Sequence, residues 1–180
     1  MTLRRLLAAL AVAAALLFWL ARSTATPAVE TASASPVSPL PSAISQTGGL
    51  RETVNGITYH MPYGRPTRPF TPAVQVGDII YLAGQIGTGA SAQGGVVTGG
   101  IQAETRQTML NIKDVLEKSG SDMEHVFKCT VFMGDMKEWD AMNEVYTTFF
   151  PNHKPARSAL GSTGLALGAK VEIECLAKAK

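Results

Sequence analysis

Two charged side chains near the C-terminus could together perform chemistry on a small organic acid. Arg157 lies in the segment 155–158 (PARS), and Glu172 lies in the strand-like run 170–174 (KVEIE). A guanidinium binds a carboxylate through two parallel hydrogen bonds, and a glutamate beside it can move protons. The pair therefore suits a substrate that carries a carboxylate. A structural ion pair between subunits is the alternative role for the same two residues.

The composition indicates a folded domain with no polymeric partner. The chain has 180 residues, of which 46% are hydrophobic and 17% are charged, so it can bury a core. The net charge is +2, and the basic residues form no run or helical stripe. We therefore expect no nucleic-acid partner.

The first 25 residues are predicted to be an export signal or an uncleaved membrane anchor. A basic start at residues 1–5 precedes an uncharged run of sixteen residues, 6–21. This is the layout of a signal peptide, and the run is short for a membrane span. In either case we expect the protein to be periplasmic or extracellular, and membrane contact is expected only through this segment. Residues 26–50, rich in Pro, Ser, Ala and Thr, are predicted to be a flexible tether before a domain over 51–180.

The domain is predicted to contain six strands and two helices in the order β-β-β-α-β-α-β-β. The predicted strands are 58–61, 70–76, 79–85, 126–133, 156–160 and 170–177, and the helices are 101–119 and a second between Asp135 and Pro151. Alternating apolar residues mark the strands, and a 3.6-residue period marks the helices. Gly77-Asp78 predicts a hairpin. The Gly-rich stretch 87–100 lacks both phosphate-binding motifs and is predicted to be a loop.

The second helix is predicted to begin with a capping box. Asp135 is the expected cap, and Glu138 stands three residues later. Trp139, Met142 and Tyr146 recur at helical intervals, and Phe149 extends the apolar stripe. We interpret these residues as core.

The last strand has two unlike faces. The odd-numbered residues 171–177 are apolar and are expected to face the helices, while Lys170, Glu172 and Glu174 point the other way. Phe127 is expected on the helix-covered face of its own strand. Two helices cover only one face of such a sheet, so a neighbouring subunit is expected to cover the other. Arg157 and Glu172 would then belong to a cleft between subunits.

Cysteine and histidine suggest no further chemistry. Cys129 and Cys175 both map to the helix-covered face, and two free core thiols are favoured over a disulfide. A disulfide stays open for an oxidising compartment. His60, His125 and His153 lack the spacing of metal ligands, so neither a metal site nor a cofactor is predicted.

Several segments, in order and at suitable spacing, resemble the RidA (YjgF/YER057c/UK114) family of reactive-intermediate deaminases. They are 77–86 (GDIIYLAGQI), Gln107 with 111–113 (NIK), 143–146 (NEVY), Phe149-Phe150, 155–158 (PARS) and 171–174 (VEIE). The resemblance extends from about residue 57 to the end.

The resemblance implies an α+β, chorismate-mutase-like subunit with a six-stranded mixed sheet and two helices packed on one face. It also implies a homotrimer with clefts between subunits, in which 2-imino or enamine acids are hydrolysed to 2-oxo acids and ammonia. By position, Arg157 would bind the substrate carboxylate and Glu172 would position or activate water. The backbone of Gly84 and the side chain of Asn143 would line the pocket. An imine is already electrophilic, so neither a metal nor a covalent nucleophile is required.

Some positions depart from the family pattern. Phe70 stands in the pocket where many members have Tyr, Ala83 replaces a Ser, and Ala159 stands where some members have Cys. The segment 161–168 is unusually rich in glycine. These changes bear on substrate preference more than on binding of the acid group.

The favoured hypothesis is an exported homotrimeric deaminase of small 2-imino acids. The alternative is a protein of the same fold that binds small carboxylates such as 2-oxo acids without turnover, or that serves in a stress response. A ribonuclease is less favoured because no basic groove is predicted. Retention of both Arg157 and Glu172 favours catalysis, since binding alone requires only the arginine.

Overall fold

The computed structural model describes residues 49–89 and 94–180, which lie in one compact unit, Ala43–Lys180. The predicted export signal or anchor and nearly all of the predicted tether lie outside the described residues. So does the middle of the Gly-rich loop, at residues 90–93. Among the helices of the described part, none has both the length and the apolar character needed to cross a membrane.

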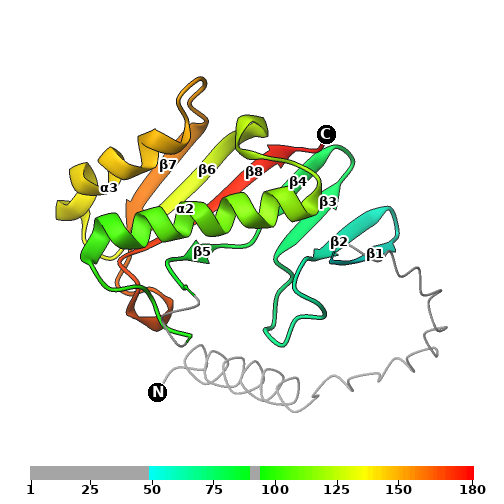
Figure 1. Cartoon of the computed structure of the whole chain (residues 1–180), viewed down its shortest axis with the longest axis horizontal. Coiled ribbons are helices and arrows are strands. Elements are labelled where there is room, and N and C mark those ends of the chain that lie inside the picture. Colours follow the sequence, from blue (N-terminus) through cyan, green and yellow to red (C-terminus); the bar gives the residue numbers. More distant parts are fainter. Residues whose placement is uncertain (1–48, 90–93) are drawn as a thin grey trace, which may run out of the picture. The chain divides into compact units, whose positions relative to one another are not determined.

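The described strands form one mixed sheet (Figure 1). They are β1 (Leu50–Val54), β2 (Ile57–Met61), β3 (Ala73–Val76), β4 (Ile79–Leu82), β5 (Gln85–Ile86), β6 (Val126–Met133), β7 (Ala156–Gly161) and β8 (Val171–Lys178). Their order is β1-β2-β3-β4-β8-β6-β7, and β5 pairs with β8 beyond the end of β4. Only the β6–β7 pair is parallel. The edge strands of this order are therefore β1 and β7.

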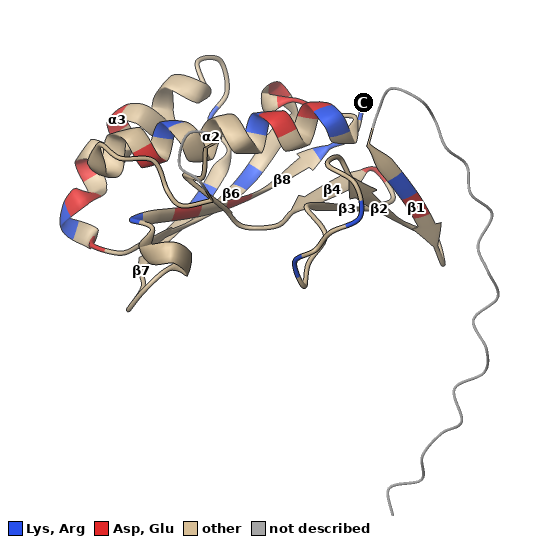
Figure 2. Ribbon diagram, turned by 60° about the horizontal axis from the view of Figure 1, so that its bottom comes forward, with Lys and Arg blue, Asp and Glu red and all other residues tan. Residues whose placement is uncertain are grey.

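Two α-helices, α2 (Gly100–Ser119) and α3 (Trp139–Tyr146), lie on the same face of the sheet (Figure 2). Short 3-10 turns accompany them at Met123–His125, Met136–Glu138, Thr147–Phe149 and Ala166–Gly168. Helix α2 packs on β8, β5 and α3. Gly120 ends α2 with φ 89°, a left-handed conformation that glycine adopts without a Cβ clash. The predicted α+β class with two helices on one face is confirmed.

The core lies between the helices and the covered face of the sheet. Val171, Ile173, Cys175 and Ala177 are fully buried there, as the alternation of the last strand predicted. Met109, Ile112 and Leu116 of α2 pack against them. Full burial of a large apolar side chain contributes about 1.5–3 kcal/mol, so this layer holds the sheet and the helices together.

The sheet has two more strands than predicted. The first, β1, pairs with β2 through a two-residue turn at Asn55-Gly56, whose φ angles are 52° and 77°. Both angles are left-handed, as the favoured hairpin turn requires. The predicted hairpin at Gly77-Asp78 is confirmed, because Val76 and Ile79 are register partners. The second additional strand, β5, is the end of the predicted strand 79–85 after a break.

Two predicted strand features differ from the structure. The strand expected from Phe70 begins only at Ala73, since Pro69 and Pro72 cannot donate backbone hydrogen bonds to a sheet. In β6, the register shifts between Val126 and Lys128, so Phe127 is an extra residue. Phe127 is consequently exposed and not in the helix-covered layer.

The predicted capping box forms only in part. The side chain of Asp135 accepts a hydrogen bond from the backbone N–H of Lys137 (2.9 Å) and caps the 3-10 turn that leads into α3. The carboxylate of Glu138 instead accepts a hydrogen bond from Lys170 Nζ at 2.9 Å. The tertiary ion pair has replaced the local contact.

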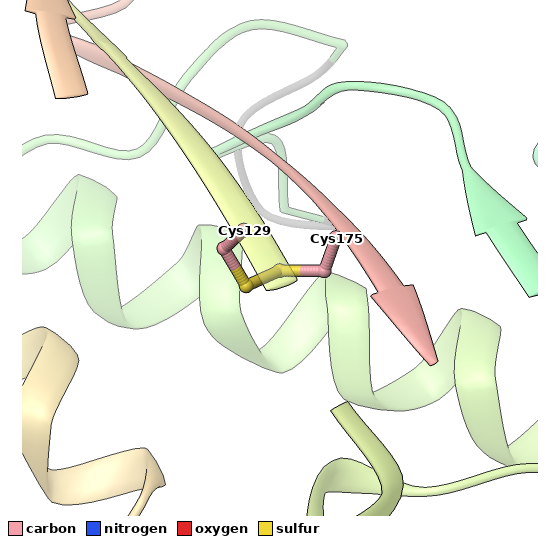
Figure 3. Close-up of a disulfide and its surroundings, with 2 residues drawn as sticks. All are labelled: Cys129 and Cys175. Atoms are coloured by element: carbon pink, nitrogen blue, oxygen red, sulfur yellow. A yellow bond between two sulfur atoms is a disulfide. The ribbon is translucent and has the colours of Figure 1, made fainter. Parts of the chain in front are cut away.

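The expectation of two free thiols is wrong. Cys129 and Cys175 form a disulfide that joins β6 to β8 on the helix side of the sheet (Figure 3). The two residues are register partners in the antiparallel pair, and their Cα atoms lie 4.1 Å apart. Directly opposite residues project to the same face of a sheet, so the register itself brings the two sulfur atoms together.

Candidate active site

Arg157 lies on the edge strand β7, and its side chain is held against α3. Its guanidinium donates a hydrogen bond to Asn143 Oδ1 at 2.7 Å. The same guanidinium lies over two aromatic rings of α3, 4.9 Å from the centroid of Trp139 and 4.8 Å from that of Tyr146. Ring faces attract cations, and a guanidinium has five N–H donors. The protein thus orients Arg157 while leaving it donors for a carboxylate.

The aromatic contacts of Arg157 were not predicted. Met142 and Tyr146 are buried and belong to the core, as expected, and Trp139 packs against it. The structure adds that Trp139 and Tyr146 also support the guanidinium. Their separation of seven residues places them on one side of the helix, but only the position of β7 shows what that side faces. Burial raises the pKa of Tyr146 to about 12, against the opposing effect of Arg157, so its phenol stays neutral.

Glu172 lies on the face of β8 that the helices leave bare, next to Gly84. A Cβ atom at position 84 would collide with the Glu172 carboxylate, so any other residue there would displace this carboxylate from its present position. Burial, and to a lesser degree the nearby Glu174, raises the pKa of Glu172 above its usual value. Its carboxylate makes no hydrogen bond with the residues that the structure describes. A carboxylate whose charge is poorly stabilised accepts a proton readily, as a general base must.

A break in the strand brings Gly84 to this position. Tyr81 pairs with Leu176 and Gln85 pairs with Ile173. Between these two pairs, the segment that joins β4 to β5 has three residues (82–84), whereas β8 has only two (174–175). The backbone N–H of Ala83 donates to the carbonyl of Pro72 at 3.0 Å, which continues the β3–β4 pairing, so the irregularity is confined to the side that pairs with β8. Such bulges redirect the chain beside functional sites.

Gly84 and Phe70 line one cavity of about 650 Å³. The other lining residues are Tyr63, Gly64, Arg65, Pro66, Thr67, Arg68, Pro72, Gln85, Ile86, Thr88, Asn111, Asp114 and Val115. Its wall is fixed by the side chain of Asn111, which donates to the carbonyls of Ile86 and Thr88, both at 2.9 Å. Gln107 Nε2 in turn donates to Asn111 Oδ1 at 2.9 Å. This network gives a structural reason for the helix motif found in the sequence.

The predicted site residues form two groups on opposite faces of the sheet. Arg157 is the register partner of Cys129, so it projects to the helix-covered face with Asn143. Glu172 projects to the bare face with Gly84. One chain therefore does not bring Arg157 and Glu172 together. Within residues 49–89 and 94–180, no group of three or more His, Cys, Asp or Glu side chains is placed to hold a metal ion.

Comparisons with known proteins agree with the fold. A family model described as endoribonuclease L-PSP matches residues 62–179. The mouse protein named 2-iminobutanoate/2-iminopropanoate deaminase is 39% identical over 109 residues, which is 61% of this chain and 80% of the mouse protein. The human protein of the same name is 37% identical over 109 residues, 61% of this chain and 79% of that protein. A Pyrococcus horikoshii relative, 38% identical over 113 residues (63% of this chain and 89% of that protein), is named only as a RutC family protein.

Solved structures show the same architecture. The yeast protein YEO7 superposes with a TM-score of 0.61 at 34% identity, over 64% of this chain and 91% of that one. The Escherichia coli YjgF gene product has a TM-score of 0.59 at 30% identity, with the same coverage. A Mycobacterium tuberculosis member of the YjgF/YER057c/UK114 family has a TM-score of 0.53 at 28% identity, over 61% and 86% of the two chains. The chain belongs to the endoribonuclease L-PSP family, and the resemblance of its motifs to RidA (YjgF/YER057c/UK114) is confirmed.

Proposed function

We propose that this protein hydrolyses small 2-imino acids to 2-oxo acids and ammonia in sites formed between two copies of the chain. The observation that carries the proposal is the presence of two complementary half-sites. Arg157 is oriented to bind a carboxylate, and Glu172, with a raised pKa, lies beside Gly84. Relatives at about this similarity are named imine deaminases.

The reaction needs only water and proton transfer. Arg157 holds the substrate carboxylate, and Glu172 takes a proton from a water molecule whose oxygen attacks C2 of the imine. The C=N double bond becomes a single bond, and Glu172 returns the proton to nitrogen. Glu172 then moves the remaining proton from the new hydroxyl group to nitrogen, the C–N bond breaks, ammonia leaves, and the former water oxygen becomes the carbonyl of the 2-oxo acid. Positioning and general acid–base catalysis supply the acceleration.

The bare face supports a homotrimeric assembly in this proposal. Tyr81 and Leu160 are 45% and 44% exposed on that face. Exposed apolar groups of this kind often mark contact surfaces. A ring of three copies, each placing its bare face against the β7 edge of the next, would bring Arg157 of one copy to Glu172 of another. We also propose that residues 1–25 direct export, with 26–50 as a tether.

Binding without turnover is the second candidate. The Arg157 half-site is complete within one chain, because Asn143, Trp139 and Tyr146 all come from α3. Carboxylate binding therefore does not depend on Glu172. A protein that binds 2-oxo acids tightly and leaves imine hydrolysis at the uncatalysed rate would have this second function.

Mixing two inactive variants tests the proposal. We expect Arg157→Ala and Glu172→Gln each to lose turnover of 2-iminobutanoate, generated in situ by an amino-acid oxidase and followed by ammonia release. When equal amounts are dissociated and reassembled together, about a quarter of the sites in a cyclic assembly combine two intact halves. Activity should return to about that fraction of the wild-type value. No return of activity in mixed assemblies rules out a site shared between chains, and an inactive wild-type protein rules out the deaminase.

A further inference from the structure

The cavity beside Gly84 is larger than a minimal substrate requires. It encloses about 650 Å³, well within the range of pockets that enclose drug-sized ligands. The smallest 2-imino acids, with a methyl or ethyl side chain, fill only a fraction of this volume. Glu172 does not itself line the cavity, but its carboxylate approaches Gly84, which does, so the cavity begins at the residue next to the proposed base.

The charges of the lining residues favour an anion in that space. Arg65 and Arg68 both line the cavity, and the lining includes a single acidic residue, Asp114. Arg68 has no carboxylate within ion-pair distance in the part of the chain that the structure describes. Arg65 pairs with Glu52 at 3.4 Å, but the Arg65 side chain is largely exposed. Exposed pairs of this kind contribute little, so Arg65 remains able to turn toward a ligand.

The negative charge of Asp114 is already compensated by neighbouring side chains. Its Oδ2 accepts hydrogen bonds from Lys118 Nζ and from the hydroxyl of Tyr63, both at 2.6 Å. Burial alone would raise the pKa of Asp114, but these two hydrogen bonds outweigh it and lower the pKa. Asp114 is therefore ionised and compensated by Lys118, and it does not neutralise the two arginines.

We propose that this cavity receives the side chain of the substrate and that Arg68, with Arg65, binds a second carboxylate carried by it. The preferred substrates are then 2-imino acids with an acidic side chain, such as 2-iminosuccinate or 2-iminoglutarate. This inference rests on the proposed deaminase function and assigns its substrate class. Phe70, which also lines the cavity, offers an apolar wall to the methylene groups between the two carboxylates.

Two substrates of nearly equal size test the role of charge. They are 2-iminoglutarate and its 5-amide, generated by amino-acid oxidases from glutamate and glutamine. A hydrogen bond to a charged group changes binding by about tenfold to a hundredfold. We expect the wild-type protein to favour the diacid over the amide in kcat/KM by about that factor. Arg68→Gln should lower this ratio about tenfold, and the additional change Arg65→Gln should bring it near one.

The matched control is Arg106→Gln. Arg106 is an exposed arginine of α2 that does not line the cavity, so its replacement removes the same charge elsewhere. We expect the diacid-to-amide ratio to stay at the wild-type value in this variant. An equal change of the ratio in Arg106→Gln and Arg68→Gln would reflect the net charge of the protein and would overturn the inference. A wild-type ratio near one would do the same.

Binding measurements separate this inference from the proposed deaminase function. Isothermal titration with 2-oxoglutarate and with 2-oxobutanoate requires no turnover. Tighter binding of 2-oxoglutarate that is lost in Arg68→Gln supports the second carboxylate site even when no imine is hydrolysed, and that result contradicts only the deaminase. Hydrolysis of 2-iminobutanoate together with equal affinity for the two 2-oxo acids retains the deaminase and rejects the second site.

Discussion

The two halves of the proposed site differ in how firmly a single chain holds them. Arg157 has a hydrogen bond to Asn143 and two aromatic rings beneath it, all from α3. Glu172 lies on a bare sheet face, makes no hydrogen bond within the described residues, and has Glu174 near it. The cation is oriented before any partner arrives, whereas the carboxylate depends on a neighbour to enclose it.

This difference between the two half-sites suggests that Arg157 serves substrate binding and Glu172 serves the chemical step. A guanidinium that is already oriented loses little side-chain entropy when it binds a ligand. A weakly stabilised carboxylate is a better proton acceptor but a less stable part of the fold. We therefore expect changes near Arg157 to act mainly on KM and changes at Glu172 to act mainly on kcat. Variants of the two halves test this division.

Replacing Arg157 should have the largest effect. Arg157→Ala removes two charge-assisted hydrogen bonds to the substrate carboxylate, each worth about 1.5–3 kcal/mol. We expect kcat/KM for 2-iminobutanoate to fall about a thousandfold in the oxidase-coupled assay. Arg157→Lys, which keeps the charge without the planar fork, should recover only part of the loss. An Arg157→Ala protein within tenfold of wild type would mean that the carboxylate is bound elsewhere.

Removing the disulfide tests how much this bond stabilises the sheet between the two halves. Cys129 is the register partner of Arg157, and Cys175 shares β8 with Glu172. The bond closes a loop between residues 46 positions apart, for which chain entropy predicts about 4 kcal/mol of stability. The double variant Cys129→Ala/Cys175→Ala should lose about this amount in urea unfolding. Two reactive thiols in the oxidised, denatured wild type would contradict the bond.

Glu172→Gln should lower kcat by about a hundredfold with little change in KM. The raised pKa of Glu172 places the acidic limb of the wild-type pH profile above the usual glutamate value of 4.5. Activity falls as the pH drops through that pKa, because the base becomes protonated. The limb should disappear in the variant. An unchanged limb would assign it to another group.

The same substitution should stabilise the fold at neutral pH. Folding raises the pKa of this carboxyl group. The folded protein therefore loses stability as the pH rises from the pKa of the group in the unfolded chain to its pKa in the folded chain. The neutral glutamine avoids this loss, so the Tm of Glu172→Gln should exceed that of wild type at pH 7. The difference should vanish below the unfolded pKa. Thermal scans at the two pH values measure both quantities.

The aromatic support of Arg157 should give the smallest effect. Trp139→Leu removes one ring face, worth about 0.5–2 kcal/mol to a cation, and should raise KM up to about tenfold with kcat nearly constant. Tyr146→Phe is the matched control, because it keeps the ring and removes only a buried hydroxyl without a hydrogen-bond partner in the described region. Equal losses in both variants would indicate core damage.

Local patterns in the sequence predicted much of the fold. The period of α2, the glycine at its end and the two faces of β8 depend on residues close in sequence, and all were confirmed. The turn at Asn55-Gly56 was missed although its signal is present, since this pair favours a hairpin. With it, β1 could have been predicted from the sequence.

Other features depend on register between distant segments. The free-thiol expectation placed Cys129 and Cys175 on the correct face, but their pairing needs the alignment of β6 with β8. In the same way, the direction of Arg157 follows from its pairing with Cys129. The alternation within β7 is too short and too exposed to show which side faces α3. Tertiary packing decides both.

The strand order has a practical consequence for attaching this protein to a surface. The described chain enters the sheet at β1, and the order places β1 and β7 at opposite margins. An immobilising linker joined ahead of residue 49 would therefore meet the molecule at the margin remote from Arg157. Capture through the amino-terminal side should therefore leave the β7 edge, with the proposed carboxylate-binding residue Arg157, accessible to small molecules in solution.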